Sequence, residues 1–322
     1  MTHPDRLPLS RREWLRRGGL SLGAAVTASA TAAAFAAALR QTAEPFRYCL
    51  NTATIRGQKL PLPAVARIAA KAGYQAIEPW VGEIDDYVNQ GGSLADLKKQ
   101  IADLGLSVES SIAFGDWISD EAERSPQGLE TCKRDMDRVA RIGGKRICAP
   151  PSGAKKVADT DLAKIARRYR RLLELGRQFG VVPQVELWSH SKTLHRMSEI
   201  AYVVVEANHP DACALLDVIH IYRGSPGFAG VRMFSSQALH TFHINDYPAH
   251  SPRETLSDAA RVFPGDGIAP LAALLGDLRA IGFRGVLSLE LFNHDYWQRD
   301  ALEVARTGLE KMRAVAATAG SQ

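Results

Sequence analysis

The sequence predicts an α/β fold in which a single domain forms a (β/α)8 TIM barrel. From Pro45 onward, short apolar runs alternate with segments of helical periodicity, a pattern that predicts a parallel sheet covered by helices. Eight such units occupy about 280 residues, close to the roughly 250 residues typical of a closed barrel. An open doubly wound sheet is the alternative, but the loop after the first strand, LNTATIRGQKLP, lacks the glycine-rich phosphate-binding pattern of that fold.

Residues 1–43 are expected to be a twin-arginine signal peptide and short linker, and residues 44–322 to form the barrel domain. The string SRREWLR carries paired arginines and precedes an alanine-dominated run at residues 20–39. It resembles a twin-arginine export signal, with Trp14 where that pattern usually has phenylalanine. A retained membrane anchor is the alternative, because the run is about long enough to span a bilayer. We expect recognition by the twin-arginine export machinery, no permanent anchor and a periplasmic location.

Export also changes how the charge is interpreted. The whole chain has a net charge of +5, but residues 1–38 contain five arginines against Asp5 and Glu13. This segment therefore has a net charge of +3, and its removal leaves the exported domain with a net charge near +2. A near-neutral domain gives little support for nucleic-acid binding, which requires a basic patch on the folded part.

The four cysteines are predicted to be free, buried thiols. Their spacings contain no CxxC motif, and three of them lie in apolar, strand-like runs. A disulfide remains the alternative in an oxidising compartment.

The first half of the domain contains four predicted strand–helix units. Gly73 ends the first helix, and Ser93 is a candidate N-cap of the second. The fourth helix has an arginine-rich outer face, which we interpret as solvated surface. The predicted strands are residues 47–54, 74–80, 107–114 and 146–150, and the predicted helices are residues 62–73, 93–105, about 125–143 and 159–180.

Each of the last four predicted strands carries a side chain that can bind a metal. VVPQVELW contains Glu186, CALLD ends at Asp217, HTFHIND contains His243 and GVLSLELF contains Glu290. Because the carboxyl ends of barrel strands meet at one mouth, these four side chains are expected to share a pocket. The helices of this half are predicted at residues 193–207, 228–235, 269–280 and 300–317.

Three carboxylates in one pocket call for a cation. Partly desolvated carboxylates repel one another and become protonated unless a positive charge lies between them. A divalent metal held by Glu186, Asp217, His243 and Glu290 would resolve this. Oxygen ligands with one imidazole favour Mn²⁺, with Mg²⁺ or Co²⁺ as alternatives, over a structural zinc. Since the twin-arginine route exports folded protein, a weakly held Mn²⁺ could be loaded before export.

The order and spacing of these residues resemble the xylose isomerase-like TIM-barrel superfamily, also called the sugar phosphate isomerase/epimerase family, over nearly the whole exported domain. The resemblance implies the same four metal ligands and a small carbohydrate substrate. In DVIH, His220 matches a histidine that usually contacts substrate. PGDG, with Asp266, resembles the turn after strand seven, and GYQAIEPW, with Glu78, resembles the strand-two signature.

The expected activity is isomerisation or epimerisation through an enediolate. A metal chelated by adjacent oxygens of a sugar polarises the carbonyl and acidifies the neighbouring C–H. Glu186 and Glu290 are the candidate acid–base pair. The predicted substrate contacts are His220, His190, Glu78, Trp188 and Asp266. For three of them a structural role is the alternative: Glu78 could anchor loops, His190 could lie at the rim, and Trp188 could cap the core.

Other functions remain open at this point. A lyase would use the same enediolate to expel a leaving group, as in a dehydratase or an enzyme that cleaves 3-keto-glycosides. A non-catalytic sugar-binding protein is the third class. A DNA-cutting barrel of the endonuclease IV type needs more histidine ligands than the first four strands supply. The long loop at residues 247–263 is expected to shape the pocket or a contact in a homo-oligomer.

Overall fold

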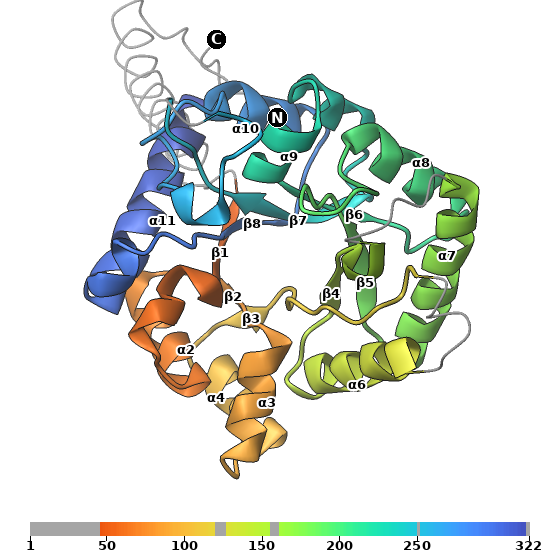
Figure 1. Cartoon of the computed structure of the whole chain (residues 1–322). Coiled ribbons are helices and arrows are strands. Elements are labelled where there is room, and N and C mark those ends of the chain that lie inside the picture. Colours follow the sequence, from red (N-terminus) through yellow and green to blue (C-terminus); the bar gives the residue numbers. More distant parts are fainter. Residues whose placement is uncertain (1–45, 120–126, 155–160, 250–251, 320–322) are drawn as a thin grey trace, which may run out of the picture. The chain divides into compact units, whose positions relative to one another are not determined.

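The computed structural model describes residues 46–119, 127–154, 161–249 and 252–319, which form a closed β/α barrel (Figure 1). Eight parallel strands follow the order β3-β2-β1-β8-β7-β6-β5-β4. The barrel closes where the backbone N–H of Cys148 donates to the carbonyl oxygen of Ser111 at 2.8 Å. The predicted barrel is therefore confirmed, whereas the expected signal peptide lies outside the described residues.

The strands are short and almost wholly buried, because helices cover their outer face and side chains fill the interior. The parallel register places Asn51 beside Glu78, and Asp217 beside His243. Polar side chains near the strand ends therefore meet at one end of the barrel. The strands are β1 (Arg47–Asn51), β2 (Ala76–Glu78), β3 (Ser107–Val108), β4 (Arg146–Ala149), β5 (Val182–Glu186), β6 (Ala214–Asp217), β7 (Leu239–Ile244) and β8 (Val286–Leu289).

The helices surround the strands (Figure 1). Gly73 ends the first of them with a φ of 100°, a left-handed conformation that glycine adopts without strain. Ser93 caps the N-terminus of α4 through its side chain, as predicted. No helix in the described ranges is long and apolar enough to cross a membrane. The α-helices are α2 (Leu62–Ala72), α3 (Val81–Asn89), α4 (Leu94–Asp103), α6 (Gln127–Arg141), α7 (Leu162–Phe179), α8 (Met197–Glu206), α9 (Val218–Gly224), α10 (Leu271–Ala280) and α11 (Ala301–Thr318).

Some connections differ from the prediction. The helix expected at residues 228–235 is the 3-10 helix η3 (Ala229–Met233), and α3 and α9 are additional helices. The other 3-10 helices are η1 (Thr52–Gln58), η2 (Ser152–Ala154), η4 (Asp258–Ala260) and η5 (Tyr296–Gln298).

The loop after β7 is anchored by a single carboxylate. Asp246 accepts hydrogen bonds from the backbone N–H groups of Gly265, Gly267 and Ala269 at 2.8–3.1 Å. Its own backbone pairs with Val262 in an isolated bridge. These contacts fix the second half of the loop, so that η4 and the residue after it are held at the carboxyl end of the barrel.

Candidate metal centre and active site

Three of the four predicted metal ligands form a compact buried group. One ligand atom from each of Asp217, His243 and Glu290 lies within 4.8 Å of the others. His243 Nδ1 is 3.2 Å from Glu290 Oε2 and 3.6 Å from Asp217 Oδ2. All three side chains are almost inaccessible to solvent. The strand-end pattern in the sequence therefore identified side chains that meet in space.

Glu78 fixes the orientation of the His243 ring. His243 Nε2 donates to Glu78 Oε2 at 2.9 Å, and the same oxygen accepts from Ser288 Oγ at 2.7 Å and Asn51 Nδ2 at 3.0 Å. The other ring nitrogen, Nδ1, is buried and has no hydrogen-bond partner. A carboxylate behind a histidine whose second nitrogen faces two more carboxylates is a common arrangement at metal sites. The residues present therefore fit a divalent metal.

Arg261 is the cation that sequence reasoning missed. Its Nη1 donates to Asp217 Oδ2 at 2.9 Å and to Glu290 Oε2 at 2.6 Å, and the residue is 1% exposed. The guanidinium thus lies between two of the predicted ligands. Because Arg261 comes from the long loop after β7, strand-end reasoning could not place it. The available signal was an arginine three residues before the PGDG turn.

The pKa values follow from these contacts. Burial alone would raise the pKa of Asp217, but Arg261 and neighbouring histidines hold it well below its usual range. Burial alone would lower the pKa of His243, yet the Glu290 and Glu78 carboxylates raise it well above its usual value. In the chain by itself, an imidazolium and a guanidinium therefore offset much of the negative charge of the buried carboxylates. A metal bound to His243 Nδ1 would release the proton from that nitrogen.

Glu186, the fourth predicted ligand, is buried at the end of β5 but lies outside the group of three. Its Oε2 accepts a hydrogen bond from Cys148 Sγ at 3.1 Å. The pKa of Glu186 is raised to about 8, because burial and the charge of Glu290 outweigh the opposing charge of His243. Without a metal, Glu186 is therefore mainly protonated at neutral pH.

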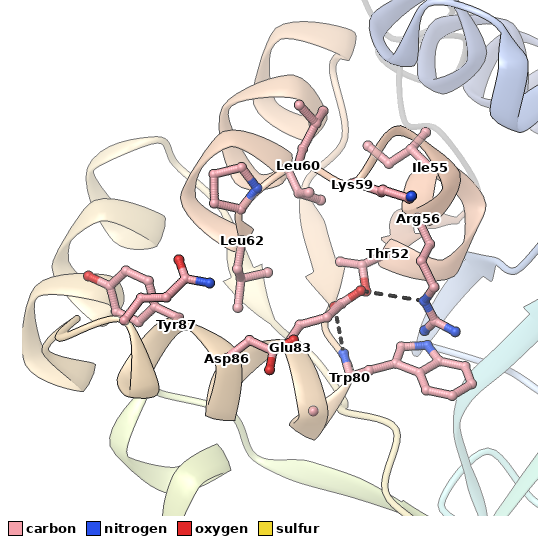
Figure 2. A pocket seen from close by; sticks show the side chains of 14 residues that line it. Thr52, Ile55, Arg56, Lys59, Leu60, Leu62, Trp80, Glu83, Asp86 and Tyr87 are labelled. Atoms are coloured by element: carbon pink, nitrogen blue, oxygen red, sulfur yellow. Dashed lines mark hydrogen bonds and ion pairs between the residues drawn. The ribbon is translucent and has the colours of Figure 1, made fainter.

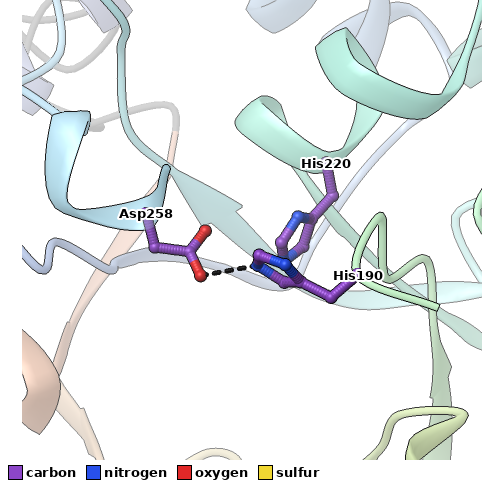
Figure 3. Close-up of side chains that lie close together, drawn as sticks. All are labelled: His190, His220 and Asp258. Atoms are coloured by element: carbon purple, nitrogen blue, oxygen red, sulfur yellow. Dashed lines mark hydrogen bonds and ion pairs between the residues drawn. The ribbon is translucent and has the colours of Figure 1, made fainter. Parts of the chain in front are cut away.

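A second polar cluster adjoins this centre and contains two of the predicted substrate contacts. His190, His220 and Asp258 offer ligand atoms that also lie within 4.8 Å of one another (Figure 3). His190 Nε2 is 2.7 Å from Asp258 Oδ2, and Ser189 Oγ is 2.8 Å from His220 Nδ1. Burial lowers the pKa of His220 to about 3, although Asp217 opposes that shift, so the ring is neutral.

Aromatic side chains continue from this cluster around the mouth. Trp188 contacts the His190 ring with centroids 5.5 Å apart, and Phe114 at 6.0 Å. Trp80 contacts Phe114 at 5.4 Å and Phe292 at 5.9 Å. Trp188 is thus part of a rim of rings beside the centre, consistent with either stacking on a substrate or capping the core.

Asp266, the remaining predicted contact, does not join either cluster. Its carboxylate pairs with Lys311 of α11, and both side chains are partly exposed.

A cavity of about 580 Å³ lies beside the centre, between η1 and α3 (Figure 2). Arg56 lies over the Trp80 ring, 3.7 Å from its centroid, and its Nε is 3.7 Å from Glu83. None of the predicted site residues lines this cavity. Trp80 forms part of its wall and donates through Nε1 to Asn51 Oδ1 at 3.0 Å, so the wall touches the network around Glu78.

Comparison with known proteins agrees with the fold. The model of a family described as "Xylose isomerase-like TIM barrel" matches residues 66–315. The inosose isomerase of Bacillus velezensis is 26% identical over 273 residues, which cover 84% of this chain and 96% of that protein. The 3-dehydroshikimate dehydratase of Pseudomonas putida is 24% identical over 255 residues, 78% of this chain and 39% of that protein.

Solved structures show the same barrel. The structure of IOLI protein with a bound zinc atom has a TM-score of 0.77 at 22% identity and covers 86% of this chain and all of that one. D-psicose 3-epimerase, solved in the presence of D-fructose, has a TM-score of 0.67 at 18% identity and covers 84% and 99% of the two chains.

Proposed function

Because the chain belongs to the xylose isomerase-like TIM barrel family, we propose that it is a divalent-metal-dependent isomerase or epimerase acting on a sugar or keto-sugar. One observation carries the proposal: the buried Nδ1 of His243, which has no hydrogen-bond partner, faces Asp217 and Glu290. Names of relatives support it, since they include an inosose isomerase and a fructoselysine 3-epimerase. The zinc in the IOLI structure supports a divalent ion, and we propose Mn²⁺, with Mg²⁺ or Co²⁺ as alternatives.

Four residues would hold the metal: Glu186, Asp217, His243 and Glu290. When bound, the metal would polarise a substrate carbonyl and make the adjacent C–H more acidic. Arg261 Nη1 would have to leave its present position between Asp217 and Glu290. It would remain near the site, because its Nη2 also contacts Asp258 Oδ1 at 3.2 Å.

Proton transfer would fall to the two glutamates. Glu186 ends β5 and Glu290 follows β8, so the two carboxylates would approach the reacting carbon from different directions. One carboxylate would remove the proton α to the carbonyl, and the other would return a proton to the opposite face. Asn51 Nδ2 donates to Glu290 Oε1 at 3.2 Å and would help to keep that carboxylate in place.

The proposed location is the periplasm, reached through the twin-arginine machinery. It rests on the SRREWLR string and the alanine-rich run after it. A periplasmic enzyme would act on an unphosphorylated sugar, because sugar phosphates are mainly cytoplasmic.

Isotope exchange tests this proposal. Exported protein supplied with Mn²⁺ is incubated with an inosose, a cyclic polyol ketone, in deuterium oxide. We expect deuterium at the carbon next to the carbonyl, and we expect Glu290→Gln to reduce its incorporation at least about 10²-fold. Wild-type protein that incorporates no deuterium into inososes or other keto-sugars would contradict the proposal.

A dehydratase or other lyase is the second candidate. The 3-dehydroshikimate dehydratases among the relatives favour it. In a lyase, the same proton abstraction would be followed by loss of an oxygen substituent from the next carbon. Release of water or an alcohol, with formation of an unsaturated ketone, would distinguish this reaction from simple exchange.

A further inference from the structure

The pair of His190 and Asp258 has the geometry of a proton-transfer dyad. The Asp258 carboxylate is ionised, because Arg261 and His190 hold its pKa well below the usual range although burial alone would raise it. His190 Nε2 must therefore donate the hydrogen bond of 2.7 Å to Asp258 Oδ2. Among the described residues, no hydrogen bond engages His190 Nδ1, and the side chain is 28% exposed. Nδ1 is thus available to exchange a proton with a ligand at the mouth.

Nearby charges favour proton transfer over metal binding at this cluster. Arg223 Nη1 lies 3.4 Å from His190 Nε2, and Arg261 Nη2 lies 3.2 Å from Asp258 Oδ1 and 3.5 Å from His220 Nε2. Two guanidinium groups would repel a divalent cation placed among these three side chains. The positive charge of Arg261 also offsets the negative charge of Asp258, the only carboxylate among the three side chains.

The dyad lies close enough to the metal centre for one small substrate to reach both. The His190 and His220 rings meet edge to face with centroids 5.5 Å apart (Figure 3). His220 Nε2 in turn adjoins the Arg261 guanidinium. The other terminal nitrogen of Arg261 contacts Asp217 and Glu290. Two side chains therefore separate His190 from the centre, and its partial exposure places it towards solvent, where a substituent of a bound sugar would project.

We propose that His190, oriented by Asp258, is a general acid that protonates an oxygen leaving group, which gives this site a β-eliminating activity on keto-sugars. The inference rests on the proposed function, because a glutamate must first remove the α-proton. In a 3-keto-glycoside, the proton on C2 goes to the glutamate, the C–H electron pair becomes the C1–C2 double bond, and the C1–O bond breaks. The departing oxygen keeps that bond's electron pair and takes the proton from Nδ1 of His190, which reacts as the imidazolium while its Nε2–H stays bonded to Asp258.

The products are an unsaturated keto-sugar and an alcohol, or water when the leaving group is a hydroxyl. His190 then regains a proton from solvent, and the glutamate loses one to it. This assignment explains why a histidine–carboxylate pair accompanies a centre whose two glutamates already suffice for epimerisation.

Two substrates with different leaving groups test the inference. Methyl 3-keto-glucoside releases a strongly basic alkoxide that needs a proton, whereas p-nitrophenyl 3-keto-glucoside releases a stable phenolate that does not. We expect His190→Gln to slow cleavage of the methyl glycoside about 10²- to 10⁴-fold and to leave cleavage of the p-nitrophenyl glycoside close to the wild-type rate. Asp258→Asn should also slow cleavage of the methyl glycoside and leave cleavage of the p-nitrophenyl glycoside nearly unchanged, but its effect should be smaller than that of His190→Gln.

His195→Gln is the matched control, because His195 is also a partly buried histidine paired with a carboxylate, Glu199, on the side of α8. It should leave both rates unchanged. Equal loss of both activities in His190→Gln would show a merely structural role and overturn the inference, as would unchanged cleavage of the methyl glycoside. Wild-type protein that exchanges the α-hydrogen but cleaves neither glycoside would overturn this inference and leave the proposed function intact. Protein that does neither would overturn the proposed function as well.

Discussion

Arg261 and the carboxylates it joins define the chemistry of the site at the level of single residues. The guanidinium is buried and pairs with Asp217 and Glu290 through one nitrogen. Removing one partner from a buried ion pair leaves the other charge uncompensated, which is more costly than losing an exposed pair. The same guanidinium competes with any metal for these two carboxylates.

Arg261→Gln should lower the free energy of unfolding of the metal-free protein by about 3–5 kcal/mol. Added Mn²⁺ should then raise the melting temperature of the variant more than that of the wild type, because the metal no longer displaces a guanidinium. Thermal unfolding with and without Mn²⁺ measures both effects.

Arg177→Gln is the control, because Arg177 pairs with Asp211 on the surface. It should leave stability and the response to Mn²⁺ nearly unchanged. An Arg261→Gln protein that is as stable as the wild type, or that gains less from Mn²⁺, would contradict this account of the centre.

The sequence predicted the site residues at strand ends and missed Asp258 and Arg261 in the loop after β7. Asp217, His243 and Glu290 could be found because a polar residue at the end of an apolar run has a defined position in a barrel. Arg261 and Asp258 could not, because their positions depend on the path of the loop that Asp246 anchors. The fourth predicted ligand, Glu186, is at the mouth but turned towards Cys148. Its role as a ligand stays a prediction.

At the level of elements, α9 links the two polar clusters. Asp217 is the last residue of β6 and also the N-cap of α9, where its Oδ1 accepts from the backbone N–H of Ile219 at 2.8 Å. His220 lies in the first turn of the same helix. The position of α9 is therefore fixed at its start by a predicted metal ligand and near its end by close packing at Gly224.

Gly224→Ala should destabilise the protein by about 1–3 kcal/mol and shift α9. A Cβ atom at this position would lie only 1.7 Å from the carbonyl oxygen of His195, which is backbone and cannot rotate away. Denaturant unfolding measures the loss. As the control, Gly276→Ala in α10 meets nothing within 4 Å and should stabilise the protein by about 0.4–1 kcal/mol. If Gly224→Ala and Gly276→Ala gave proteins of equal stability, the contact between Gly224 and the His195 carbonyl would not be tight.

Periodicity predicted the long helices but not the short ones. The segments that became α2, α4 and α7 have clear apolar faces and end signals, such as Gly73 and Ser93. By contrast, α9 has only seven residues, and its first four, residues 218–221, are all buried. Its sequence therefore shows no amphipathic pattern. The segment expected as a helix at residues 228–235 is short and contains Gly230, a poor helix former, and it forms only the 3-10 helix η3.

On the scale of the whole molecule, the closed barrel explains why residues scattered over the sequence share one mouth. Closure also buries most residues of the strands, including Cys49 in β1 and Cys148 in β4, while Cys132 is buried in α6 and Cys213 just before β6. The sequence predicted free buried thiols, and the structure confirms this for Cys49, Cys132, Cys148 and Cys213. Burial raises the pKa of each thiol, which suppresses the reactive thiolate.

A thiol reagent should therefore react slowly with the native protein and label all four cysteines once the protein is denatured without reductant. Mass spectrometry of the labelled chain gives the count. Fewer labelled cysteines in denatured protein would reveal a disulfide, and rapid labelling of the native protein would contradict the burial of these side chains.

The central claim is that Asp217, His243 and Glu290, with Glu186, bind one divalent metal at the mouth of the barrel. Titration with Mn²⁺, followed by electron paramagnetic resonance of the free ion, tests it most directly. The account predicts a single Mn²⁺ per wild-type chain, loss of that binding in Asp217→Asn, and unchanged binding in Asp266→Asn, whose carboxylate pairs with Lys311 away from the centre. Wild-type protein that binds no Mn²⁺, or an Asp217→Asn variant that binds it as tightly, would contradict the claim.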